Sequence, residues 1–141
     1  MSTTDDGIWA ARRAPGLDEF HRIATGAFED LPAAFRAVCG DVFVHVSEMA
    51  TDEVLDDLGI EDPLELTGLY EGATVFDADA GGDAFGAHVH LYRLPVLYEW
   101  CERGDVTLSD LIRHVLVHEI GHHFGLSDED MHRIEAMADA D

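Results

Sequence analysis

The feature that constrains the fold most is the eleven-residue stretch from His118 to Asp128, which reads HEIGHHFGLSD. It contains the pattern H-E-x-x-H and continues as x-x-G-x-x-D, which is longer and rarer than the two-histidine pattern alone. Residues four apart lie on one face of an α-helix, so His118 and His122 can bind a common metal ion. Glu119 is rotated by about 100° from His118, which places it beside the metal. The rest of the chain has to hold this helix.

The sequence around the motif supports a helix over residues 108–124. Thr107 begins a capping pattern, and Gly125 is suited to the left-handed conformation that ends a helix. Ser127 or Asp128 can then cap a last helix that runs to residue 138. The motif helix has an apolar stripe with helical spacing, made by Leu108, Leu111, Ile112, Val115, Leu116 and Ile120. We expect this stripe to face the core.

The remaining sequence predicts a mixture of helices and strands. Apolar periodicity and capping residues predict helices at residues 17–31, 32–38, 52–58 and 95–103. Alternating or β-branched runs predict strands at residues 42–46, 66–70, 73–77 and 88–92, with a Gly- and Asp-rich loop at 79–86. The strand at 88–92 is expected at a sheet edge, where an extended peptide can pair with it. Its two histidines, His88 and His90, are expected to be exposed on one face.

The organisation along the chain predicts one domain over residues 1–141. There is no internal repeat and no low-complexity linker, and residues 1–15 lack periodicity, so they read as a flexible arm. Cys39 and Cys101 have no C-x-x-C spacing and read as reduced core residues. The sequence contains no apolar leader and no run of about 18 apolar residues, so we expect a cytoplasmic protein. We also expect it to be a monomer.

The net charge of the chain limits the classes of molecule that it can bind. The net charge is −22, from 30 acidic residues against 8 basic ones, all of them arginine. A field of this sign repels nucleic acid and anionic membranes, and it favours cations and basic peptides. We therefore expect no nucleic-acid or membrane partner.

The third metal ligand is open at this point. Asp128 fits the spacing of the extended motif, but an aspartate there can also simply cap the last helix. His132 lies four residues further along the same helical face, and Glu135 follows one turn later. We favour Asp128, with His132 and Glu135 as the alternatives. His123 points away from the metal face by about 100° and reads as a neighbouring or surface residue.

The residue types indicate hydrolytic chemistry. Two histidines and one carboxylate leave a fourth position of a tetrahedral Zn²⁺ open for water, which is the catalytic arrangement. Glu119 can act as general base on that metal-activated water as it attacks a carbonyl, and can then deliver the proton to the leaving amine. A site that only binds metal has no use for a base at this position.

A family resemblance rests on these residues. The segment from Val117 to Gly125, followed by residues 127–130, resembles the minimal zincins, small bacterial proteins of zinc metallopeptidase type. Residues 31–35, 69–72 and 91–93 also resemble that family, so the likeness covers about residues 17 to 135. It implies a zincin-like α+β fold, with a small mixed sheet packed on the active-site helix. It also implies Zn²⁺ held by His118, His122 and Asp128.

The sequence departs from the metzincins, whose motif string is similar. A metzincin continues into a C-terminal subdomain with a methionine turn below the metal, whereas only residues 129–141 follow Asp128 here. Met131 and Met137 lie in the predicted last helix and read as core or surface residues. We expect a zinc-dependent metallopeptidase acting on a peptide or protein. The alternatives are a zinc-binding module that holds a peptide or partner with little or no turnover, and a hydrolase of other amide bonds.

Overall fold

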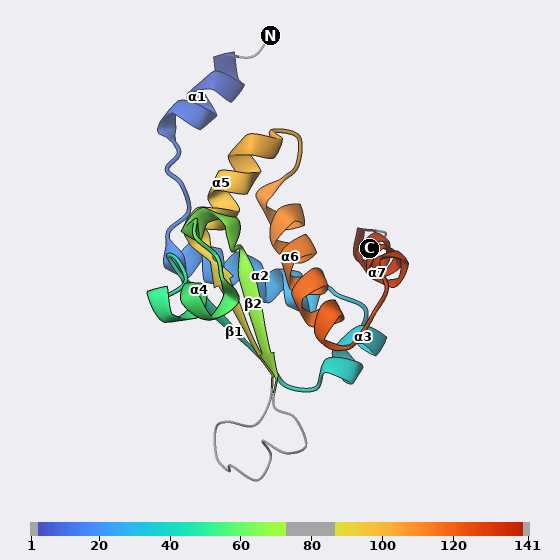
Figure 1. Cartoon of the computed structure of the whole chain (residues 1–141). Helices are drawn as coiled ribbons and strands as arrows, with labels where there is room; N and C mark the ends of the chain where they lie inside the picture. Colours follow the sequence, from blue (N-terminus) through green and yellow to red (C-terminus); the bar gives the residue numbers. More distant parts are fainter. Residues whose placement is uncertain (1–2, 73–86, 140–141) are drawn as a thin grey trace.

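The computed structural model describes residues 3–72 and 87–139 (Figure 1). Seven α-helices and three strands occur in this part of the chain. The helices are α1 (Thr3–Ala11), α2 (Leu17–Glu29), α3 (Ala33–Cys39), α4 (Asp52–Leu58), α5 (Arg93–Arg103), α6 (Leu108–His123) and α7 (Asp128–Asp139), with a 3₁₀ turn η1 (Pro63–Glu65). The strands are β1 (Val42–Ser47), β2 (Gly68–Gly72) and β3 (Ala87–Tyr92). The expected α+β class is confirmed.

The three strands form one mixed sheet in the order β1-β3-β2. β1 runs parallel to β3, with Val44 opposite Val89, and β2 runs antiparallel to β3, with Tyr70 opposite Val89. β3 is therefore the central strand. The expectation that residues 88–92 lie at the sheet edge is wrong, because β3 pairs with β1 on one side and with β2 on the other. Among the described strands, β1 and β2 are the edges.

Helices α2 and α6 pack together on one face of the sheet (Figure 1). Phe20 and Ala24 of α2 meet Leu116 of α6 and the inward residues Val89 and Leu91 of β3, all buried. Burial of such side chains contributes roughly 1.5–3 kcal/mol each, so this layer supplies much of the folding free energy. The apolar stripe of α6 is fixed against the sheet as a result.

A second apolar cluster joins α6 to α3 and α7. Val117 and Ile120 of α6 pack against Met131 of α7, with Leu31 and Phe35 on the other side. Gly121 lets the two helices approach closely, because a Cβ built there would lie 2.5 Å from Sδ of Met131. Met131 is thus a core residue, in agreement with expectation, and α7 is held against the motif helix.

Helix ends follow the local sequence signals. The Thr51 and Thr107 hydroxyls accept hydrogen bonds from the backbone N–H groups of Val54 and Asp110, which caps α4 and α6. Gly125, with φ of 73°, adopts the left-handed conformation in the turn between α6 and α7. The Ser127 hydroxyl accepts from the N–H of Asp130, so Ser127 is the cap of α7.

The N-terminal segment, which we expected to be a flexible arm, forms helix α1 at residues 3–11. Cys101 is exposed on α5 and is not a core residue, whereas Cys39 is buried. The strand at 73–77 and the loop at 79–86 lie outside the described residues.

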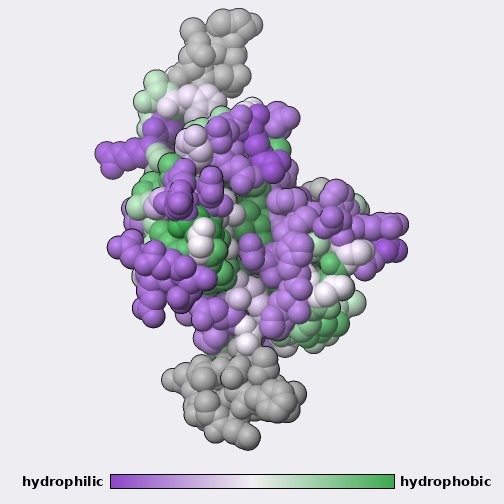
Figure 2. Space-filling model, in the orientation of Figure 1, coloured by the Kyte–Doolittle hydropathy of each residue, from purple (hydrophilic) through white to green (hydrophobic). Residues whose placement is uncertain are grey.

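Hydrophilic side chains dominate the face shown in Figure 2, as the composition requires. In the described part of the chain, no helix combines the length and the apolar character needed to cross a membrane.

We predict that Gly121→Ala lowers the free energy of unfolding by about 1 kcal/mol. Alanine gains about 1 kcal/mol of helix propensity over glycine, but overpacking against Met131 costs about 1–3 kcal/mol. Gly26→Ala in α2 is the matched control, because nothing lies within 4 Å of a Cβ there, and it should stabilise the protein. Urea unfolding measures both. Equal stabilisation by the two substitutions would contradict the close α6–α7 contact.

We also predict that one of the two cysteines reacts rapidly with a thiol reagent at pH 8. Burial raises the pKa of Cys39 to about 11, so only about one part in a thousand is thiolate at that pH. Cys101→Ser should remove the fast phase and Cys39→Ser should leave it. Rapid reaction of the Cys101→Ser protein would show that Cys39 is accessible.

Candidate metal centre

Helix α6 presents three histidines on its polar side at four-residue spacing. They are His114, His118 and His122, which follow one another by about one turn and so share a face. The ring centroids of His114 and His118 are 4.0 Å apart, and those of His118 and His122 are 5.9 Å apart. His118 is therefore the central member of the row.

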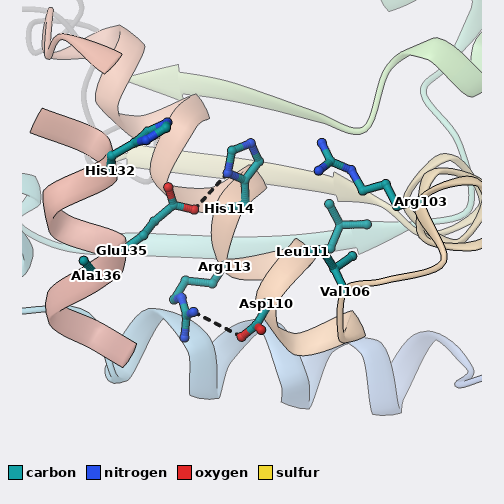
Figure 3. A pocket seen from close by; sticks show the side chains of 9 residues that line it. All are labelled: Arg103, Val106, Asp110, Leu111, Arg113, His114, His132, Glu135 and Ala136. Carbon is teal, nitrogen blue, oxygen red and sulfur yellow. Dashed lines mark hydrogen bonds and ion pairs between the residues drawn. The ribbon is translucent and has the colours of Figure 1, made fainter. Parts of the chain in front are cut away.

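Glu135 reaches this row from α7. Its Oε1 lies 2.9 Å from Nδ1 of His114, and its Oε2 lies 3.7 Å from Nε2 of His118. Figure 3 shows the Glu135 side chain extending from its helix toward His114. Ligand atoms of these three residues all lie within 4.8 Å of one another. This is the donor spacing that one metal ion could draw together.

The state of His118 tests whether the residues fit a metal. Its Nε2 is buried and has no hydrogen-bond partner among the described residues, since Oε2 of Glu135 is too distant. A buried polar atom without a partner costs free energy unless something else binds it. Burial, and then the neighbouring His114, lower the pKa of His118, although Glu135 acts in the opposite direction. An imidazole nitrogen that has no hydrogen-bond partner and whose pKa is lowered is a suitable ligand for Zn²⁺.

The rings of His122 and His132 lie farther from the His118 ring than that of His114 does. His122 is exposed at the last turn of α6, and the ring of His132 on α7 lies 6.2 Å from that of His118. Asp128 lies in the first turn of α7 and is exposed. Its assignment as third ligand stays a prediction. His123 packs against the Tyr70 ring of β2, with centroids 4.3 Å apart, and so belongs to the sheet side of α6.

Glu119 lies where α6 meets the edge strand β2. A Cβ built at Gly68 would lie 3.3 Å from Cγ of Glu119 and 2.9 Å from Cγ1 of Val115, so only glycine lets the strand come this close. Burial raises the pKa of Glu119, while the charge of His122 opposes that shift. A carboxylate with a raised pKa is a stronger base, which suits proton transfer near neutral pH.

A pocket of about 330 Å³ adjoins the candidate metal ligands His114 and Glu135, between α6, α7 and the end of α5. Figure 3 shows His114, His132 and Glu135 on one side of it and Arg103 and Arg113 on others. Both arginines also pair with acidic neighbours, Glu99 and Asp110. The centre therefore borders a space with mixed charge.

The sequence missed His114 as part of the site. Its spacing of four residues before His118 is the same signal that joins His118 to His122, and that signal could have identified it. Glu135 was an alternative third ligand, and the structure brings it to His118. The sequence does not show how α7 packs on α6. That packing decides which residue of α7 faces each histidine of α6.

A profile of the zincin-like metallopeptidase family matches residues 39–138, more than two thirds of the chain. The match spans the described sheet, α6 and nearly all of α7, and it includes each of the metal-binding candidates. A search of curated proteins gave no match. With its family profile, its α+β fold and a histidine–carboxylate cluster on the motif helix, this chain belongs to the zincin-like metallopeptidase family.

Proposed function

We propose that the protein is a zinc-dependent peptidase in which Glu119 is the general base. The observation that carries the proposal is the position of Glu119, partly buried on α6 beside His118 and His122 and against Gly68 of the edge strand β2. Base, metal-binding histidines and a strand edge thus lie together. Hydrolysis of an extended peptide needs these three parts.

The proposed zinc ligands are His118, His122 and Asp128. The extended motif and the family support this set, and so does the left-handed turn at Gly125, which redirects the chain from α6 into α7. Zinc, when bound, supplies Lewis acidity that polarises a carbonyl group and lowers the pKa of a water molecule. The histidine rings contribute neutral nitrogen donors, and Asp128 would contribute a carboxylate oxygen.

Glu119 transfers the proton, first as a general base and then as a general acid. Its carboxylate accepts a proton from the attacking water and can return it to the nitrogen of the leaving amine. Burial favours this role, because a desolvated carboxylate holds a proton more firmly than an exposed one. The neighbouring His122 acts against this rise in the pKa of Glu119.

The substrate would bind along β2. β2 pairs with β3 on one side and with no other described strand, so an extended peptide can add to its free edge through backbone hydrogen bonds. Since β2 lies against α6 at Gly68, a peptide on this edge passes close to Glu119. The net charge of −22 favours basic peptides over acidic ones.

A rival ligand set has direct geometric support. His114, His118 and Glu135 already hold their ligand atoms within 4.8 Å, and the unpartnered Nε2 of His118 belongs to both sets. In the rival set Glu135 replaces Asp128 and His114 replaces His122. Glu119 keeps its place beside His118 in either case.

We predict that Glu119→Gln abolishes peptide hydrolysis and leaves zinc content unchanged. The amide cannot accept the proton, and losing a general base costs about 10²–10⁴ in rate. Cleavage of a peptide library by the zinc-loaded protein, with and without chelator, gives the activity, and elemental analysis gives the metal content. Glu53→Gln, exposed at the start of α4, is the control and should retain activity.

The same variants separate the competing functions. Equal loss of zinc and activity in Glu119→Gln would mean that Glu119 is structural. Stoichiometric zinc without cleavage of any library peptide by the wild type would favour a peptide-binding module.

We predict that Asp128→Asn weakens zinc binding at least tenfold, as loss of a direct ligand should. Competition against a chromophoric chelator measures the affinity, and Glu135→Gln, His114→Gln and His132→Gln are compared under the same conditions. A larger loss in Glu135→Gln and His114→Gln than in Asp128→Asn would assign the zinc to the rival set. A loss in His132→Gln alone would assign the third ligand to His132.

A further inference from the structure

The sheet face turned away from α2 and α6 is rich in histidine. We call it the open face, because Phe43, His45 and Glu71 on it are exposed to solvent. Strand pairing places opposite residues on the same face, so the register assigns eight side chains to it. They are Phe43, His45, Ser47, Leu69, Glu71, His88, His90 and Tyr92, of which Tyr92 is buried.

Three of these side chains are imidazoles that touch one another. Nε2 of His45 lies 2.9 Å from Nδ1 of His88. The His45 ring also stacks on the other two rings, at centroid distances of 5.1 Å to His88 and 4.8 Å to His90. His88 and His90 are two residues apart on one strand, and His45 reaches between them from the neighbouring strand.

A carboxylate completes the group. Oε1 of Glu71, on β2, lies 2.8 Å from Nε2 of His90. The group therefore draws on all three strands, with two nitrogens facing each other at one end and a nitrogen–oxygen pair at the other. Glu71 is well exposed, so an ion can reach this face from solvent.

The distances suit a transition-metal ion. Nitrogen ligands about 2.0–2.1 Å from a tetrahedral metal lie roughly 3.3–3.4 Å apart, so the His45–His88 nitrogens need to separate only slightly to share an ion. The His90 ring, whose Nε2 faces Glu71, has to turn to bring in a third nitrogen, because the ligand atoms of the three histidines do not all lie within 4.8 Å of one another. Imidazole ligands favour Zn²⁺, Cu²⁺ and Ni²⁺ over Mg²⁺ and Ca²⁺.

We propose that His45, His88 and His90 form a second binding site for a divalent transition-metal ion, on the open face of the sheet. The site lies across the sheet from α6 and shares no residue with the metal centre described above. The acidic chain raises the concentration of cations near this exposed face.

The competing account needs no metal. One neutral imidazole can donate to another, so His45 and His88 can form a plain hydrogen bond, and stacking with Phe43 extends the row at a centroid distance of 5.2 Å from His88. Under that account the three histidines would bind added metal no better than scattered surface residues. The two accounts therefore differ in stoichiometry.

Zinc titration of the full-length protein by calorimetry, in excess Ca²⁺, tests the proposal. Ca²⁺ occupies exposed carboxylate sites, which prefer hard cations, and leaves imidazole sites free. We expect two zinc ions per chain for the wild type and one for His45→Gln/His88→Gln. The double variant His118→Gln/His122→Gln, which removes ligands of the first centre, should still bind one ion on the open face. His21→Gln is the control, because His21 bonds the Val44 carbonyl and no histidine ring.

A second readout separates this proposal from the proposed peptidase. One equivalent of Cu²⁺ added to His118→Gln/His122→Gln should show nitrogen hyperfine coupling in its paramagnetic resonance spectrum, and His45→Gln/His88→Gln substitutions in that protein should remove it. Unchanged stoichiometry and spectra after those substitutions would overturn the second site. That result would leave the zinc chemistry of α6 untouched.

Discussion

Helix α6 has to satisfy two packing partners at once, and the rest of the structure depends on how it does so. Its apolar stripe is buried against the sheet and α2, and a second buried strip, at Val117, Ile120 and Gly121, receives α7. The faces that remain carry the row of histidines and Glu119. A helix packed on one side only would expose its histidines to water without bringing a carboxylate to them. The α6–α7 contact supplies that carboxylate.

Two glycines set the spacing of these contacts. Gly121 brings Met131 onto α6, and Gly68 brings the β2 edge to Glu119. Because neither glycine has a side chain, α7 and β2 can each lie close to α6. The close packing of these backbones sets where the candidate ligands, the base and the strand edge lie. If either contact were lost, the functional side chains would move relative to one another although none of them had been substituted. The arrangement explains how a small sheet and one helix can build a site between them.

Local signals predicted most of the elements. Capping residues and periodicity located α2, α4 and α6 within a few residues, because helix ends depend on neighbours in sequence. The strand at 88–92 was predicted, but its central place was not, since strand order follows from pairing across long separations. His118 and His122 could be predicted to share one face of a helix because their spacing is local. The approach of Glu135 to His114 and His118 depends on how α7 docks, which no local pattern contains.

We propose that zinc binds at His118, between α6 and α7. The most direct measurement is an anomalous difference map, recorded at the zinc edge, from crystals of the protein loaded with one equivalent of Zn²⁺. We expect a peak within bonding distance of Nε2 of His118, and the other residues around the peak will show which carboxylate of α7 completes the site. Ordered zinc elsewhere in the molecule, with none at His118, would contradict it.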